Sequence, residues 1–394
     1  MTIGIRKFKY LALIWLSMHA IAQESDPNVE LPASELTDLI GDGGIELSDS
    51  EASGSLLNRL SGRWPQDLLL APIPGRSPQF GWSLALGVGY FLRTDKQDNE
   101  TPPSLLGGFA WYAKNGSYAA GLGGNLHLRN DDVRVQFGAG YLDVAYQYYG
   151  IGDVNAAGLS VEVLQNGPLY FGSASYRVWR KLYVGLGYIG GNVDTRPRLK
   201  LDDVGPEFDL TINSQIGAIT IPIQHDSRDD DQFPREGWLV SGRANLYRDY
   251  AASDFDATTF SFSINKYLPV RDRDVLAFRG YFRTTFGDAP FFLLSTLGGA
   301  KDLRGYPSGR YRDKMMYAVQ GEYRWHVSER WILTGFAGVG ETAAEFDEFG
   351  QNFLPAAGLG ARFVISTKHR VSLSFDIARG KDSTEYYFGI NEAF

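Results

Sequence analysis

The stretch Leu303-Arg304-Gly305-Tyr306 lies in the longest polar connection of the C-terminal half, roughly residues 287 to 314, between two segments of alternating polarity. Glycine permits a sharp turn, and the guanidinium group of an arginine can bind a carboxylate in a fork geometry. If the flanking segments belong to one closed sheet, the connection can fold into that barrel and be held on its wall. This interpretation requires an acidic side chain that points inward from a neighbouring strand.

Glu322 meets the requirement. In residues 315 to 326, the odd positions include the apolar Val319 and Tyr323, whereas the even positions include Gln320 and Glu322. An alternation with a period of two is typical of a strand that has one face in an apolar medium. The pattern therefore predicts that Glu322 faces the inside and can hold the arginine of the loop.

The same alternation recurs from residue 67 to residue 394, in segments of about 10 to 14 residues, as in transmembrane barrel strands. A soluble sandwich or propeller is the alternative, because its sheets also alternate. Two features favour the membrane: the outward positions are almost free of charge, and aromatic residues cluster at segment ends, as expected for interfacial girdles. We therefore predict an all-β fold, a 16-stranded antiparallel transmembrane β-barrel whose long extracellular loop folds inward. The predicted strands are residues 67–75, 81–92, 105–114, 117–129, 132–149, 160–178, 181–193, 211–227, 237–249, 257–269, 274–286, 315–326, 330–342, 353–365, 369–379 and 385–394.

The composition bounds what else the chain can be. It has 394 residues, no cysteine and a formal net charge of -8. The lack of cysteine excludes disulfides and thiolate metal sites, and the acidity argues against nucleic acid as a partner. Residues 1–22 are predicted to be a secretory signal peptide, and residues 23–66 a flexible acidic periplasmic segment. No later apolar run is long enough for a membrane helix.

The first predicted strand contains Pro72 and Pro74, which cannot donate main-chain hydrogen bonds and belong at edges or bulges. In a closed barrel this strand must pair with the last one, which contains Phe388 and Phe394. Either the seam between the two strands is weakly bonded, or closure begins after the prolines.

The predicted inner face is rich in arginine, with Arg243, Arg279, Arg283 and Arg324 among the inward positions. One interpretation is a structural network in which outer loops supply the acids. The other is a lumen that prefers anions, including lipid headgroups. We find no catalytic set, because the histidines are scattered near strand ends, and no spaced ligand pattern for a metal. The chain is therefore predicted not to be an enzyme and to need no cofactor.

Four stretches resemble the BamA/TamA superfamily of outer-membrane assembly and secretion barrels, also called the bacterial surface antigen family. The matching stretches are Leu303-Arg304-Gly305-Tyr306 with the preceding Leu297-Gly298-Gly299, the mid-barrel turn Asp226-Ser227-Arg228-Asp229 with Phe233-Pro234-Arg235-Glu236-Gly237-Trp238, the turn Ser77-Pro78-Gln79-Phe80-Gly81, and the terminal Phe388-Gly389-Ile390-Asn391-Glu392-Ala393-Phe394. The resemblance implies sixteen strands, a sixth outer loop folded inward, and acidic groups on the wall that hold the loop arginine. It also implies an outer-membrane location, with membrane lipids and the barrel assembly machinery as partners.

The chain departs from the family pattern in two places. Gly338 occupies the position where the family has a second acidic partner for Arg304, so this arginine has one carboxylate or recruits another. Residues 23–66 are too short for a POTRA module, which receives client proteins in the family. We therefore expect a POTRA-less member that acts in outer-membrane biogenesis by opening or thinning the bilayer at the seam. The alternatives are a passive, plugged or structural barrel and, third, an outer-membrane lipid enzyme.

Overall fold

A computed structural model describes residues 68–77, 79–92, 101, 104–152, 160–198, 211–230, 233–366, 371–390 and 392–394. The predicted signal peptide, residues 1–22, and the predicted periplasmic segment, residues 23–66, lie outside the described residues.

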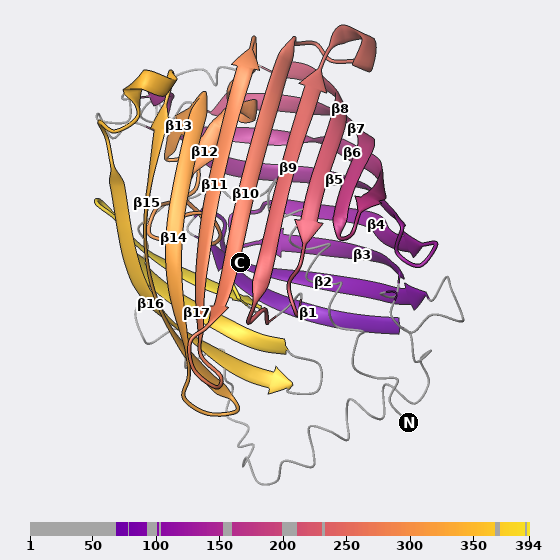
Figure 1. Ribbon diagram of the computed structural model, residues 1–394. Coiled ribbons are helices and arrows are strands. Elements are labelled where there is room, and N and C mark those ends of the chain that lie inside the picture. The colour runs from indigo at the N-terminus through magenta and orange to yellow at the C-terminus, as the bar shows by residue number, and fades with distance from the viewer. Residues whose placement is uncertain are drawn as a thin grey trace, which may run out of the picture.

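Sixteen antiparallel strands close into a barrel in which each strand pairs with its neighbours along the chain, and β1 pairs with β18 (Figure 1). The barrel strands are β1 (Leu68–Ser77), β2 (Gly81–Leu92), β3 (Ser104–Ala113), β4 (Tyr118–Leu128), β5 (Val133–Tyr148), β6 (Val161–Trp179), β7 (Leu182–Arg198), β8 (Ile212–Asp226), β9 (Gly237–Tyr247), β10 (Ala257–Pro269), β11 (Val275–Gly287), β14 (Met315–His326), β15 (Trp331–Ala343), β16 (Leu354–Ser366), β17 (Val371–Arg379) and β18 (Thr384–Ile390). The predicted all-β, sixteen-stranded antiparallel architecture is confirmed.

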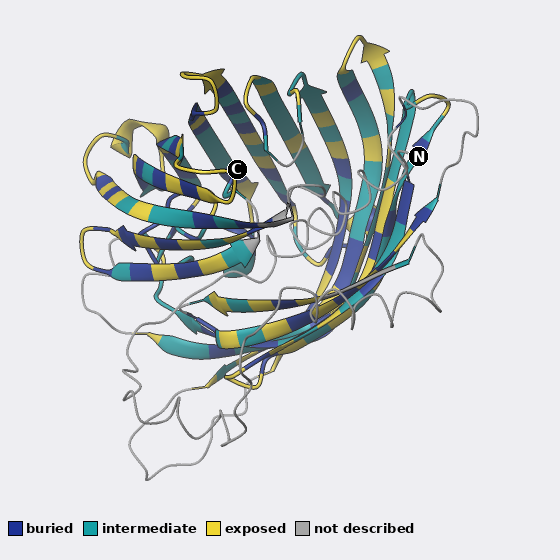
Figure 2. Cartoon of the chain, turned by 90° about the horizontal axis from the view of Figure 1, so that it is seen from below, coloured by how far each residue is buried: buried dark blue, intermediate teal, exposed yellow. Residues whose placement is uncertain are grey.

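The strands form because their side chains alternate between two environments (Figure 2). On β2, Leu84 and Leu86 are 49% and 48% exposed on the outer wall, whereas Ala85 between them is 2% exposed. An apolar outer wall is stable only against an apolar medium, and the bilayer supplies that medium. Closure of the sheet satisfies the main-chain hydrogen bonds that lipid cannot.

The structure corrects two of the predicted strand ends. The strand predicted over 181–193 continues to Arg198, so residues 194–198 belong to β7 and not to the outer loop. The strand predicted over 385–394 ends at Ile390.

The long loop between β11 and β14 also has structure that the alternation did not predict. It contains a 3-10 turn, η3 (Phe291–Leu293), and two short paired strands, β12 (Ser295–Leu297) and β13 (Tyr311–Asp313). Two further 3-10 turns, η2 (Asp249–Ala251) and η4 (Phe346–Glu348), lie in other connections. In the described part of the chain, no helix is both long and apolar enough to cross a membrane.

Candidate functional site, a loop anchored inside the barrel

The connection between β11 and β14, residues 288–314, is called the inner loop below because it packs against the inside of the wall. Its three apolar anchors, Leu297, Leu303 and Tyr306, are fully buried. They form one cluster with residues of β14 and β16, namely Met316, Ala318, Leu354 and Ala356. Burial of large apolar side chains stabilises such a contact by about 1.5–3 kcal/mol each. The predicted inward fold of the loop is therefore confirmed.

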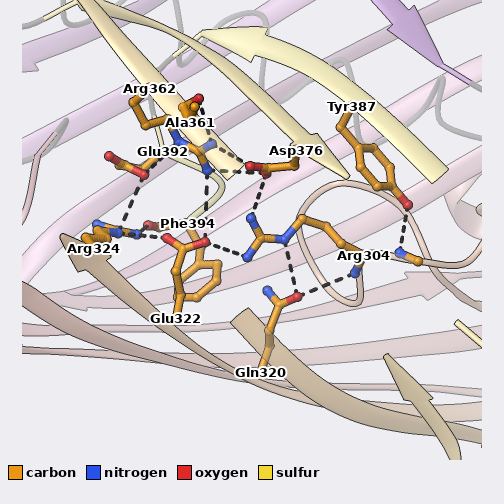
Figure 3. Close-up of polar contacts among 11 residues, drawn as sticks. Arg304, Gln320, Glu322, Arg324, Ala361, Arg362, Asp376, Tyr387, Glu392 and Phe394 are labelled. Atoms are coloured by element: carbon orange, nitrogen blue, oxygen red, sulfur yellow. Dashed lines mark hydrogen bonds and ion pairs between the residues drawn. The ribbon is translucent and has the colours of Figure 1, made fainter. Parts of the chain in front are cut away.

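Arg304 projects from the tip of the inner loop into a polar cluster on the wall (Figure 3). Its two terminal nitrogens bind Glu322 of β14 at 2.5 Å and Asp376 of β17 at 2.7 Å. Its Nε donates to the Gln320 side-chain oxygen at 3.3 Å, and its guanidinium carbon lies 3.4 Å from the centre of the Phe336 ring. Arg304 is fully buried. One guanidinium group thus joins the loop to two strands that are distant in sequence.

The two residues after Arg304 fix the loop through main-chain contacts. Gly305 has φ +111°, and an added Cβ would lie 2.9 Å from the Gly380 nitrogen. Its N–H donates to the Tyr387 hydroxyl at 3.0 Å, and its carbonyl accepts from Ser383 at 2.8 Å. The Tyr306 hydroxyl donates to the Pro355 carbonyl at 2.6 Å. Both the positive φ and the lack of space for a Cβ require glycine at position 305. Gly305 therefore allows the inner loop to lie close to β18 and to the turn between β17 and β18.

The second carboxylate comes from β17 and not from β15. Gly338 of β15 lies under the loop, where an added Cβ would be 2.9 Å from Leu303 Cδ1 and 2.6 Å from the Val319 carbonyl oxygen. An acidic side chain at this position would occupy the space that Leu303 fills. Because Leu303 fills this space, β15 has no room for the acidic side chain, and Asp376 of β17 supplies the second carboxylate instead.

The cluster continues from Arg304 toward the C-terminus. Arg324 donates to Glu322 at 2.8 Å, Arg362 donates to Asp376, and Arg362 Nε binds Glu392 at 3.1 Å. We call Arg304, Glu322, Arg324, Arg362, Asp376 and Glu392 the ion-pair network. Its three guanidinium groups and three carboxylates balance in charge, and low exposure makes each charge dependent on its partners.

The C-terminal residues turn into the barrel beyond β18. Phe394 was predicted to lie at the seam, but its side chain packs with Tyr267, Val275 and Ala277 of β10 and β11. Its main-chain oxygen accepts from Arg324 at 2.7 Å. The prediction was wrong because it assumed that the alternation of the last strand continues to residue 394. In the structure β18 ends at Ile390, and Glu392 forms an ion pair with Arg362 of the network inside the barrel.

The seam between β1 and β18 is short. In the described residues, its register consists of Arg76 opposite Phe388, whereas β1 and β2 pair over ten positions. Pro72 and Pro74 lie on the outer face of β1. Phe388 contacts the Trp82 ring at 5.4 Å, and Arg76 lies 5.6 Å from that ring. Neither Arg76 nor Trp82 was predicted as a seam residue, although an outward arginine near a strand end and a tryptophan at the start of the next strand were usable signals.

The mid-barrel turn between β8 and β9 is built by side-chain contacts. Arg228 binds Asp226 through two hydrogen bonds of 2.9 and 2.8 Å. Pro234 is buried, and Gly237 has φ +102°, with the Ser227 carbonyl 2.4 Å from the place of a Cβ. The four motif residues therefore form a closed turn with a backbone that requires glycine.

Another polar cluster lies at the turn between β4 and β5, where Asp131 binds His127 at 2.6 Å and Arg134 at 2.6 Å. Burial would raise the pKa of the Asp131 carboxyl, but hydrogen bonds from His127 and Arg134 outweigh burial and hold that pKa well below its usual range. Within the described residues, no group of three His, Asp or Glu side chains is arranged to hold a metal ion.

Two of the four predicted lumen arginines bind acidic side chains, and the other two do not bind any described acid. Arg279 binds Asp302 of the inner loop at 2.6 Å, and Arg324 belongs to the ion-pair network. Arg243 and Arg283 have no ion pair with any described residue. Acids from the loop and the wall thus neutralise only half of this set.

The fold and the anchored loop define a transmembrane β-barrel. Residues 120–390 match the model of the Omp85 superfamily domain. The chain belongs to the Omp85 superfamily and is a barrel of the bacterial outer membrane. Barrels of this superfamily are generally non-enzymatic transporters or insertases.

Solved structures with this fold include BamA from Haemophilus ducreyi lacking POTRA domains 1–3, with a TM-score of 0.58 at 14% identity over 82% of this chain and 70% of that one. CdiB from Escherichia coli has a TM-score of 0.57 at 12% identity, over 83% of this chain and 62% of that one. CdiB from Acinetobacter baumannii has a TM-score of 0.53 at 13% identity, over 82% and 59%. Identities this low show a shared fold. No curated protein sequence matches the chain significantly.

Proposed function

We propose that the protein acts in outer-membrane biogenesis, inserting or translocating protein or lipid at the seam between β1 and β18, without covalent chemistry. The observation that carries this proposal is the short pairing at the seam. β18 ends at Ile390, so the part of β1 before Pro74 extends beyond the register that Arg76 and Phe388 define.

An unpaired strand edge is unfavourable in lipid, because each unsatisfied main-chain group in hydrocarbon costs several kcal/mol. The part of β1 before Pro74 contributes to this edge, and neither Pro72 nor Pro74 has an N–H to donate. A strand edge of this kind can pair with an incoming strand or disturb the lipids beside it. Outer-membrane lipids are therefore proposed partners, and the barrel assembly machinery is a proposed partner during the protein's own insertion.

The anchored loop supports the proposal because it ties the seam to the rest of the wall. Gly305 contacts Ser383 and Tyr387 beside and on β18, and Arg304 binds Asp376 on the adjacent β17. The inner loop therefore holds the strands next to the seam in place while the seam itself is weakly paired. We propose that this loop sets how far the seam opens.

A cystine lock tests the proposal, since the native chain has no cysteine. Arg76→Cys with Phe388→Cys joins the two seam strands at their register pair. Leu84→Cys with Tyr112→Cys is the matched control, because these outward residues are register partners on β2 and β3. Opposed residues on antiparallel strands have Cβ atoms about 4.5–5.5 Å apart, close enough for a disulfide after a small adjustment.

The variants are expressed in cells that lack the native protein, and outer-membrane protein and lipid content is measured before and after a reductant. We expect the seam lock to remove the protein's contribution until the disulfide is reduced, and the control lock to have no effect. If the locked seam functions like the wild type, the lateral route is wrong.

The second candidate is a passive or plugged channel, which the buried inner loop favours. Single-channel conductance of Arg304→Ala in planar bilayers separates the two. A large rise in conductance together with a functional locked seam supports the channel.

A further inference from the structure

Arg243 of β9 and Arg283 of β11 lie on one row of the inner wall. Both are register partners of Ser261 on β10. Phe260 and Phe262, on either side of Ser261, are exposed on the outer wall, so Ser261 and its two partners face inward. Neighbouring strands are about 4.8 Å apart, which places the two arginine Cα atoms about 10 Å apart. Two long side chains at this spacing can reach one small ligand between them.

Within the part of the chain that the structure describes, neither arginine has an acidic partner such as those of Arg279 and Arg324. Arg283 donates one N–H to the Leu293 carbonyl at 3.0 Å, and its Nε has no hydrogen-bond partner among the described residues. Arg243 is exposed although it faces inward, and it makes no hydrogen bond or ion pair with a described residue.

Among the described residues, the inner loop supplies no acid to Arg243 or Arg283. Asp302 of the inner loop is engaged by another arginine, because its Oδ1 accepts two hydrogen bonds from Arg279, at 3.0 and 2.6 Å. Two like charges that share a lumen without a counter-charge are stabilised by a bound anion.

We propose that Arg243, Arg283 and the Ser261 hydroxyl form a binding site for a phosphate-type oxyanion, either inorganic phosphate or the phosphomonoester headgroup of a lipid. A guanidinium group presents two parallel N–H donors that fit two oxygens of one phosphate. A phosphate dianion matches two guanidinium charges, whereas a carboxylate matches one. The serine hydroxyl adds a donor at the midpoint of the row. The site is separate from the ion-pair network and does not depend on the seam mechanism.

The test is a calorimetric titration of the full chain, purified in phospholipid-free detergent, with inorganic phosphate. The variants are Arg243→Gln, Arg283→Gln and the double variant. Arg198→Gln is the matched control, because Arg198 is half exposed in a pair with Glu162 at the end of β7. Loss of one charge-assisted fork should weaken phosphate binding by at least about tenfold. Arg243→Lys keeps the charge but not the fork and should bind phosphate with intermediate affinity.

A wild type that shows no phosphate binding up to about 10 mM, or a folded double variant that binds as the wild type does, overturns the proposal. Heat-dependent mobility in gels verifies that each variant is folded. A second titration uses a short-chain phosphatidic acid below its micelle-forming concentration. Tighter binding of this lipid than of phosphate, lost in the same variants, assigns the site to a headgroup. Equal or weaker binding, lost in the same variants, assigns it to free phosphate. Lipid binding that survives in the double variant counts against the site.

Discussion

Replacement of Arg304 by alanine should destabilise the barrel and release the inner loop. The substitution leaves Glu322 and Asp376 fully or nearly buried without their shared partner. Breaking a buried ion pair by removal of one partner costs about 3–5 kcal/mol. Here Glu322 keeps Arg324 at 2.8 Å and Arg362 at 4.0 Å, and Asp376 keeps Arg362, which reduces the cost. The lost contact with the Phe336 ring adds a smaller term. We expect the free energy of unfolding to fall by about 3 kcal/mol.

The assay is urea unfolding of purified protein in micelles, followed by tryptophan fluorescence, together with limited trypsin digestion of the inner loop. Arg310→Ala is the control, because Arg310 lies in the same loop but only in a partly exposed pair, 4.0 Å from Asp382. This control should lose less than about 1 kcal/mol. Arg304→Lys should recover only part of the stability, since an ammonium group cannot bridge two carboxylates in a fork geometry.

A double-mutant cycle with Asp376→Ala measures the coupling directly. Residues in one buried network are coupled by about 0.5–3 kcal/mol, and we expect the upper half of this range for Arg304 and Asp376. If Arg304→Ala unfolds at the same urea concentration as the wild type, with the inner loop still protected from trypsin, the anchor reasoning is refuted.

Three further predictions follow from other contacts. Gly338→Ala should lower the free energy of unfolding by about 1–3 kcal/mol in the same urea assay, because the added Cβ would clash with the Val319 carbonyl and Leu303. Gly335→Ala on the same strand is the control and should change the free energy little, because the nearest atom to its added Cβ is 3.7 Å away. Equal effects of the two substitutions would contradict the packing argument. Phe394→Ala should cost the refolded protein about 3 kcal/mol by emptying the inner-wall contact, and an unchanged unfolding midpoint would place this ring outside the fold. Because the folded pKa of Asp131 is depressed, its stabilisation is complete above the unfolded pKa of about 4 and is lost as pH falls through the folded value. The stability difference between wild type and Asp131→Asn should therefore shrink as the pH is lowered below about 4, and a difference independent of pH would exclude the carboxylate as its source.

The sequence was sufficient for the barrel because the main signal is local. Period-two alternation depends only on which residues face lipid, and all sixteen strands follow from it to within a few residues. The pairing of Arg304 with Glu322 was also accessible, since the loop motif and the inward parity of Glu322 lie within twenty residues of each other.

The remaining features depend on contacts between distant segments. Nothing near Asp376 in the chain indicates that it binds Arg304, because the two residues are 72 positions apart and become neighbours only when the barrel closes. The end of β18 also depends on a distant contact. The alternation of residues 386–390 continues in the sequence, but the ion pair of Glu392 with Arg362 directs the chain inward.

The lumen arginines show most clearly what the sequence alone determines and what only the tertiary structure decides. Alternation alone placed Arg243, Arg279, Arg283 and Arg324 on the inner wall, because side-chain direction in a strand is fixed by parity. Which of them find a carboxylate is decided by where the inner loop and the C-terminal residues lie in space. Electrostatic pairing acts over a few ångströms in three dimensions, whatever the separation along the chain, so only the tertiary structure distinguishes the paired arginines from the unpaired ones.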